Sequence, residues 1–270
     1  MTAIDTGTEE LLCQITDRVA VITLNKPHKK NALGDVLTPA LRRTLLAVEA
    51  RDDVGCVLLT GAGNAFCAGG DITEMGGGGG DEPPPPAAER VSTLLHKQET
   101  LTLRLHELEK ITIAALPGAA AGAGFSIALA CDLRVAADSA FVTTAFRNIG
   151  LSGDYGASWF LPQLIGLAKA KELFYTARRV GAEEGERLGL FNAVFPDSTF
   201  REDAFAYASD IANGATNALG RMKKNLNQGA TQSLRESLLL EARHLIESTG
   251  DPEMREAVRA FVEKRPPNFR

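Results

Sequence analysis

The sequence predicts an α/β fold in which short parallel strands alternate with helices. Short apolar runs bounded by glycine or turn residues recur along the 270-residue chain, and longer segments with apolar residues at helical spacing separate them. Continuous apolar runs of this length are typical of parallel strands that are buried on both faces. Their alternation with helices is the pattern of an α/β architecture.

The first strand and helix are predicted near the N-terminus. Residues 18–25 alternate in the manner of a strand that ends at Lys26-Pro27, and residues 35–51 carry apolar residues at helical spacing. Residues 55–61 form a continuous apolar run between glycines, which predicts a buried parallel strand. Further strands are predicted at residues 112–116, 133–137 and 191–195. Ligands bind where loops leave the carboxyl ends of such strands.

The C-terminal part of the chain is predicted to be entirely helical. From Thr199 onward the pattern is helical throughout, with helices predicted at residues 201–213, 218–228, 233–247 and 252–264. We therefore divide the chain into a core of residues 1–198 and a helical region of residues 199–270. The apolar faces of these helices require cover from the core or from another subunit.

A low-complexity insert interrupts the first half. Five glycines at residues 76–80 and four prolines at residues 83–86 neither pack nor continue a helix, so a mobile loop is predicted. A phosphate-cradling loop is the alternative, but no Lys-Ser/Thr follows the glycines. We expect the insert and residues 89–109 to cover a substrate pocket.

Composition excludes several classes of function. A net charge of −5 argues against a nucleic-acid surface, and no apolar stretch reaches the roughly 18 residues of a membrane span. The N-terminus lacks a basic segment followed by an apolar one, so we expect a cytoplasmic protein with no membrane partner. The cysteines are isolated, which predicts buried thiols rather than disulfides or a metal site. They stand at Cys13, Cys56, Cys67 and Cys131.

Two turns of small residues carry the strongest chemical signal. Residues 66–72 (FCAGGDI) and 117–124 (PGAAAGAG) each lie between a strand-like and a helix-like run. Each turn can direct a free backbone N–H at a single oxygen, and the helix after the second turn adds its positive end. Two such donors stabilise the charge that develops when a thioester carbonyl becomes an enolate. The alternative is that these glycines and alanines only permit close packing.

The two turns, in the order in which they follow one another along the chain, resemble those of the crotonase superfamily, also called the enoyl-CoA hydratase/isomerase family. Residues 25–33 (NKPHKKNAL) resemble its Asn-Arg-Pro-x-x-x-Asn-Ala-Leu segment, and residues 59–72 resemble its first oxyanion segment. Similar segments follow at residues 128–136, 182–192 and 260–265. The resemblance implies a crotonase-like spiral of repeated ββα units with a C-terminal helical region that builds trimers, often paired into hexamers. It also implies an acyl-CoA substrate and no cofactor beyond the coenzyme A of that substrate.

The family resemblance assigns binding roles to individual residues. It implies that the backbone N–H groups of Gly70 and Ala123 form the oxyanion hole. Phe261 and Lys264 match a pair that reaches the CoA of a neighbouring subunit in some relatives; a core Phe and a surface Lys are the alternative. The positions that line the CoA path in relatives are Lys29, Ala32, Phe66, Ala68, Asp71 and Ile72. Cys67 lacks a base partner, so a buried thiol is preferred over a nucleophile.

The acid/base residues differ from those of the family's hydratases. The two glutamates of the hydratases are replaced by Ser126 and by Ala145 or Phe146. A serine one turn into a helix bonds either a ligand or a preceding carbonyl, so Ser126 is an auxiliary candidate. Asp154 remains as the leading acid/base, in a Gly-Leu-x-x-Asp segment that resembles the family's isomerase branches. The alternative for Asp154 is a turn residue or a helix N-cap.

One carboxylate suits an isomerase, because the same group can remove a proton and return it at another carbon. The expected reaction is the shift of a double bond or the rearrangement of an activated ring in an acyl-CoA. An enoyl-CoA hydratase is the alternative enzyme. A non-catalytic acyl-CoA-binding protein is the alternative of another class.

Overall fold

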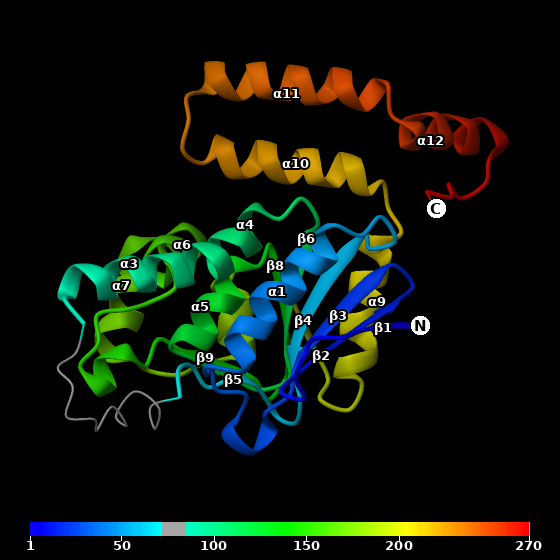
Figure 1. The fold of residues 1–270 in the computed structure, drawn as a ribbon. Helices are drawn as coiled ribbons and strands as arrows, with labels where there is room; N and C mark the ends of the chain where they lie inside the picture. Colours follow the sequence, from blue (N-terminus) through cyan, green and yellow to red (C-terminus); the bar gives the residue numbers. More distant parts are fainter. Residues whose placement is uncertain (72–84, 270) are drawn as a thin grey trace.

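A large mixed sheet forms the centre of the computed structural model, which describes residues 1–71 and 85–269. Its strand order is β1-β2-β3-β4-β6-β8-β11 (Figure 1). The strands span Thr2–Ile4, Leu11–Thr16, Val19–Leu24, Cys56–Gly61, Ile111–Leu116, Leu133–Ala137 and Ala193–Phe195. From β3 to β11 all neighbours are parallel, whereas β1 and β2 pair antiparallel. The predicted strands at residues 18–25, 55–61, 112–116, 133–137 and 191–195 are confirmed.

A second sheet of short strands builds a repeating unit with the first. Its order is β10-β9-β7-β5, and β5, β7 and β9 are parallel. These strands span Val180–Gly181, Phe141–Thr143, Ala119–Ala121 and Ala65–Cys67. Since β5 follows β4, β7 follows β6 and β9 follows β8, each unit contributes one strand to each sheet before its helix. This is the repeated ββα arrangement that the family resemblance implies.

Helices surround the two sheets. Helix α9 packs across β3, β4, β6, β8 and β11, while α5 contacts β5 and β7. The helices of this part are α1 (Leu37–Glu49), α3 (Ala87–Gln98), α4 (Arg104–Glu107), α5 (Ala123–Ala130), α6 (Ala157–Ile165), α7 (Leu167–Thr176), α8 (Ala182–Arg187) and α9 (Phe200–Ala212). Helix α5 is buried along its whole length, because its residues are small or apolar on every side.

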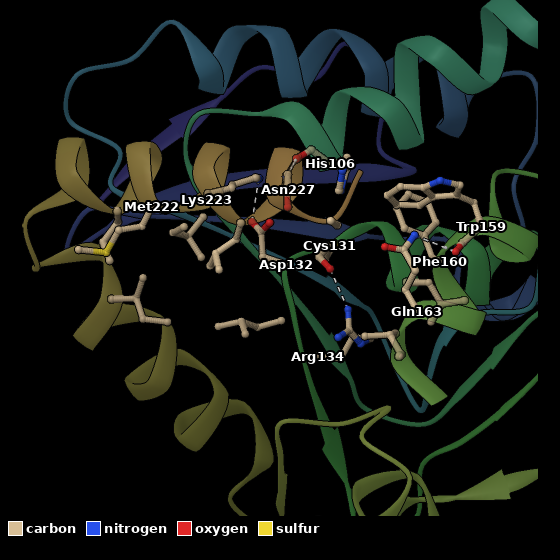
Figure 2. A pocket seen from close by; sticks show the side chains of 18 residues that line it. His106, Cys131, Asp132, Arg134, Trp159, Phe160, Gln163, Met222, Lys223 and Asn227 are labelled. Carbon is tan, nitrogen blue, oxygen red and sulfur yellow. Dashed lines mark hydrogen bonds and ion pairs between the residues drawn. The ribbon is translucent and has the colours of Figure 1, made fainter. Parts of the chain in front are cut away.

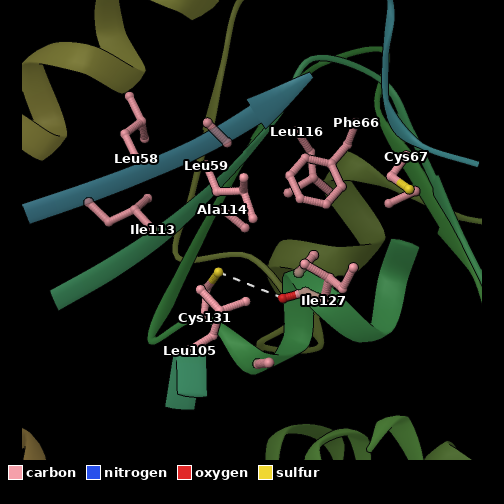
Figure 3. Packing of buried hydrophobic residues seen from close by; sticks show 14 of the residues in the cluster. Leu58, Leu59, Phe66, Cys67, Leu105, Ile113, Ala114, Leu116, Ile127 and Cys131 are labelled. Carbon is pink, nitrogen blue, oxygen red and sulfur yellow. Dashed lines mark hydrogen bonds between the residues drawn. The ribbon is translucent and has the colours of Figure 1, made fainter. Parts of the chain in front are cut away.

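One part of the hydrophobic core lies between β4, β6, β5 and α5 (Figure 3). Leu59, Phe66 and Leu116 are fully buried there, and the Cys131 thiol points at the Ile127 carbonyl oxygen at 3.7 Å. All four cysteines are buried and free, as predicted. Burial raises the pKa of Cys131 to about 12, so this thiol stays protonated.

The C-terminal helices lie largely outside the core. The predicted helices are observed as α9, α10 (Thr216–Gly229), α11 (Leu234–Thr249) and α12 (Pro252–Glu263). Helix α9 buries Phe200, Ala204, Ala208 and Ala212 against the sheet, whereas α10 contacts it at β6 and lies side by side with α11 (Figure 1). Large apolar side chains of α10 to α12 are exposed, among them Leu226, Leu245, Ile246, Phe261 and Val262. The division at residue 199 stays a prediction.

Some features of the sequence analysis lie outside the described residues. Most of the glycine- and proline-rich insert and Ile72 fall in residues 72–84; the described chain resumes at Pro85, and Pro86 is the N-cap of α3. In the ranges 1–71 and 85–269, no helix is long and apolar enough to cross a membrane.

Candidate functional site

The two small-residue turns lie side by side because the strands before them pair. β5 and β7 are parallel neighbours, with Ala65 opposite Ala119, so both turns leave the same edge of the small sheet. Gly69 has a φ of +98°, and a Cβ there would lie 2.9 Å from the Ala121 carbonyl oxygen and 3.5 Å from the Ala123 nitrogen. Only glycine fits this conformation and this close approach. The sequence therefore brings the two predicted donors together.

The Gly70 N–H faces away from the strand-like segment at Leu33. Leu33 N donates to the Gly69 carbonyl oxygen at 2.8 Å, and Asp71 N donates to the Leu33 carbonyl oxygen at 2.8 Å. Successive N–H groups of an extended segment point to opposite sides, so the N–H of Gly70 points away from Leu33. In the described part of the chain it donates no hydrogen bond. This N–H is available to a ligand.

The second donor is the first residue of α5. Ala123 follows Gly122, whose φ is +51° and which provides no side-chain cap. The first bond of the helix runs from Ser126 N to the Gly122 carbonyl oxygen at 3.0 Å, so the Ala123 N–H has no acceptor within the helix. The positive end of a buried helix adds to the potential at this point.

One cavity joins the two turns to the predicted acid/base residue. Gly70, Ala123 and Asp154 all line a cavity of about 250 Å³. Its other walls include Leu33 and Thr38, Arg42 of α1, Leu94 of α3, and Tyr155. Leu94 belongs to the segment 89–109 that we expected to cover the pocket. The arrangement places a carboxylate and two backbone donors around one space.

Asp154 is not the N-cap of α6, so this alternative is wrong. The N-cap is Gly156, and no side chain caps the helix. The Asp154 carboxylate instead accepts two hydrogen bonds on Oδ1, from Gln98 Nε2 at 2.5 Å and from Tyr155 N at 2.7 Å. Oδ2 accepts none from residues 1–71 and 85–269. Oδ2 is therefore the oxygen that is available for chemistry.

Burial changes the acidity of Asp154. The carboxyl group is half-buried, and its loss of solvation raises the pKa above the ordinary value, while the bonds from Gln98 and Tyr155 oppose the rise. A carboxylate with a raised pKa is a stronger base and, once protonated, a donor that releases its proton closer to neutral pH.

The family resemblance assigns the hydratase glutamate positions to Ser126 and to Ala145 or Phe146, and none of these side chains can transfer a proton at neutral pH. Ser126 is fully buried and its Oγ donates to the Gly122 carbonyl oxygen at 3.2 Å, which is the backbone bond that its helical position suggested. Phe146 is also buried and stacks on Phe174 with the ring centroids 6.3 Å apart. Neither Ser126 nor Phe146 lines the cavity.

The predicted CoA-contact residues fall into different environments. Asp71 is buried and accepts from Lys29 Nζ at 2.6 Å, with Lys26 Nζ at 3.8 Å. The Phe66 side chain lies in the core, so only its backbone can contact a ligand. Ala32 is buried and Ala68 is exposed. These roles stay predictions.

Phe261 and Lys264 lie on the remote helix α12. Phe261 is 85% exposed and Lys264 ends the helix in a left-handed conformation. Neither residue lines the cavity of Asp154. The alternative of a core Phe does not hold in this chain.

Burial decides the interpretation of Cys67. Burial raises the pKa of Cys67 to about 12, so the nucleophile alternative fails. In the described ranges no group of His, Cys, Asp and Glu side chains could hold a metal ion.

A larger cavity of about 480 Å³ lies between α10, α6 and the sheet (Figure 2). Its walls are mainly apolar, with Trp159, Phe160 and Met222 among them. Its carboxylate, Asp132, already bonds Lys223 Nζ at 2.8 Å. Because this cavity is lined by neither of the two turns and its carboxylate is already paired, it is not the candidate catalytic site.

Sequence reasoning missed Gln98 and Arg42. Both are polar residues of helices, and nothing in their local pattern distinguishes them from residues of a solvated face. Arg42 reaches Tyr155 Oη at 3.3 Å and the Lys97 carbonyl oxygen at 3.1 Å.

Comparisons with known proteins agree with this geometry. The family model for enoyl-CoA hydratase/isomerase matches residues 14–270. The chain is 38% identical to a protein of Rhodobacter capsulatus described as "Probable enoyl-CoA hydratase", over 95% of this chain and 96% of that protein. It is 34% identical to the 1,2-epoxyphenylacetyl-CoA isomerase of Escherichia coli, over 97% and 98%. The crystal structure of an enoyl-CoA hydratase from Polaromonas sp. JS666 superposes with a TM-score of 0.88 at 32% identity, covering 96% of this chain and 99% of that one.

Proposed function

Because the chain belongs to the enoyl-CoA hydratase/isomerase family, we propose that it is an acyl-CoA isomerase that uses Asp154 as its only proton carrier. The reaction is the shift of a double bond or the rearrangement of an activated ring. The observation that carries the proposal is that Asp154 lines one cavity with Gly70 and Ala123, while its Oδ2 accepts no hydrogen bond from the described residues.

The proposed mechanism needs three groups of the protein. The thioester carbonyl oxygen accepts hydrogen bonds from the N–H groups of Gly70 and Ala123, which makes the protons along the adjacent carbons more acidic. Asp154 Oδ2 removes one proton and leaves a dienolate whose charge rests on the same carbonyl oxygen. The protonated Asp154 then returns its proton at another carbon, so no atom is gained or lost.

A hydratase would need more from the site than this cavity offers. Addition of water requires activation of the water and delivery of a proton to carbon, and a second acid/base group eases this reaction. Of the carboxylates that line the cavity, Asp71 is engaged by Lys29 and Asp35 is solvent-exposed. Hydration remains the alternative because the Rhodobacter capsulatus relative carries that name. Binding of acyl-CoA without catalysis is the alternative of another class.

Product analysis separates these three functions. The protein is incubated with 2-enoyl, 3-enoyl and aromatic CoA thioesters in D₂O, and the products are resolved by mass spectrometry. Isomerase activity gives products of the substrate's composition, with or without exchanged deuterium. Rapid formation of hydroxyacyl-CoA from a 2-enoyl thioester would replace the proposal with hydration, and binding without turnover of any thioester would favour the non-catalytic protein.

The same family premise leads us to propose a homotrimer, or a hexamer of two trimers, in the cytoplasm. The exposed apolar side chains of α10 to α12 support association, because monomers seldom expose so many large apolar groups together. We propose no nucleic-acid partner, because a net charge of −5 argues against a phosphate-binding surface. Phe261 and Lys264 would then reach the CoA of a neighbouring subunit. Light scattering tests the assembly.

A further inference from the structure

Asp154 is oriented by a side chain from a distant part of the sequence. Gln98 is the last residue of α3, and its Nε2 lies 2.5 Å from Asp154 Oδ1. The second bond to Oδ1 comes from Tyr155 N, which belongs to the same turn as Asp154. The Tyr155 bond is made within the turn itself, whereas the Gln98 bond depends on where α3 lies.

Both bonds fall on the same oxygen, and this has a geometric consequence. A carboxylate rotates about its terminal bond with little restriction, so its two oxygens are equivalent until a partner distinguishes them. The amide of Gln98 and the N–H of Tyr155 hold Oδ1 and leave Oδ2 without a partner in the described part of the chain. A fixed base within reach of a substrate is what proton transfer requires.

A second contact holds Gln98 itself in place. The guanidinium of Arg42 on α1 donates to the carbonyl oxygen of Lys97, the neighbour of Gln98, through Nε at 3.3 Å and Nη2 at 3.1 Å. Nη2 also reaches Tyr155 Oη at 3.3 Å, and Tyr155 is only 8% exposed. Arg42 therefore ties α1 to the end of α3 and to the turn that carries Asp154.

We propose that Gln98 is a positioning residue that presents Oδ2 of Asp154 to the substrate, with Arg42 holding the end of α3 from which Gln98 acts. This inference rests on the proposed function, because it assigns Gln98 a role only through Asp154. Gln98 need not touch the substrate. The charged or titratable groups that share the cavity with Asp154 are Asp35, Arg42, Asp71, Lys97 and Tyr155.

The test compares Gln98→Leu with Gln163→Leu. Among the described residues, the Gln163 side chain bonds only the Trp159 carbonyl oxygen of its own helix, so its variant makes the same chemical change at an exposed site away from Asp154. Loss of a hydrogen bond to a charged group should move the acid limb of the kcat profile upward by about one to two pH units. We expect kcat to fall about tenfold or more at neutral pH with KM nearly unchanged, and the Gln163 variant to match the wild type.

A second variant keeps the test decisive if leucine disturbs folding. Gln98→Glu has nearly the same shape and brings a like charge to Oδ1, so it should move the acid limb to higher pH still. An unshifted limb and unchanged kcat in both variants would overturn the proposal.

Titration of Asp154 separates this proposal from the proposed function. The ¹³C carboxyl signal of Asp154, assigned by its loss in Asp154→Asn, reports the pKa without any turnover. A raised pKa in Gln98→Leu supports the positioning role even if no thioester is isomerised, and an unchanged pKa overturns it even if the enzyme is an isomerase.

Discussion

Replacement of Asp154 by asparagine tests the mechanism most directly. Asparagine has the same shape, and its Oδ1 can still accept from Gln98 Nε2 and Tyr155 N, so its amide group takes the place of Oδ2 at the cavity. The substitution therefore removes the base and keeps the contacts of the turn. Loss of an acid/base group lowers turnover by a factor of about 10² to 10⁴, which corresponds to about 3–5 kcal/mol in the barrier.

Asp154→Asn should lower turnover but should not lower the stability of the fold. Burial raises the pKa of Asp154 in the folded protein, so the folded state binds this proton more tightly than the unfolded state and the wild type loses stability as pH rises through that range. A neutral asparagine lacks this dependence. We expect the free energy of unfolding of Asp154→Asn at pH 7 to equal or exceed that of the wild type.

The assay measures turnover of the best thioester from the substrate panel, and calorimetry measures the affinity of an unreactive acyl-CoA. Asp197→Asn is the matched control, because Asp197 Oδ1 also accepts two hydrogen bonds, from Ser139 N and Oγ, at an exposed site that does not line the cavity. Its turnover should equal that of the wild type. Wild-type turnover in a folded Asp154→Asn protein would refute the assignment of the base.

Three further predictions concern the same cavity and the remote tail. Gly70→Pro removes an N–H that donates no hydrogen bond in the described ranges, and it leaves the Leu33 bonds of Gly69 and Asp71 intact. The loss of transition-state stabilisation should be about 3 kcal/mol, and Gly70→Ala, which keeps the N–H, should lose less. Equal losses in turnover would mean that the N–H is not a donor in the reaction. Because the pKa of Asp154 is raised and the base must be ionised, kcat should decline as pH falls through a value above the ordinary aspartate range, and a flat profile from pH 4 to 8 would exclude this base. Lys264→Ala should weaken CoA binding less than about fivefold in a trimer or hexamer, as befits an exposed charge, and a stable monomer in light scattering would remove the shared contact altogether.

The parallel strands could be predicted because burial on both faces leaves a continuous apolar run. β4 reads CVLLTG and is buried at every position, so composition alone distinguishes it from a surface strand. The small sheet could not be predicted in the same way. β5 and β7 are three-residue strands of small residues, and their pairing joins segments that are far apart in the sequence. Strands this short have no periodicity to read.

The candidate site likewise combines features that a local sequence pattern predicts with features that depend on long-range packing. The two turns could be proposed from the sequence because small residues indicate where the backbone is accessible, and the family resemblance then assigned the donor roles to Gly70 and Ala123. Gln98 and Arg42 could not be proposed, since their role depends on where α3 lies relative to the turn at Asp154. Long-range packing decides that position, and no local pattern encodes it.

On the proposed mechanism, an isomerase differs from a hydratase in the number of proton carriers around one oxyanion hole. The backbone donors serve both reactions, because an enolate forms on the thioester oxygen in each. At position 126 the side chain is fully buried and bonds Gly122, and at position 146 an aromatic ring stacks on Phe174. A carboxylate placed at position 126 would meet a buried, water-poor environment that favours its protonated form. If the chain is an isomerase as proposed, its conversion to a hydratase would therefore require a change of the packing around α5 as well as a new carboxylate.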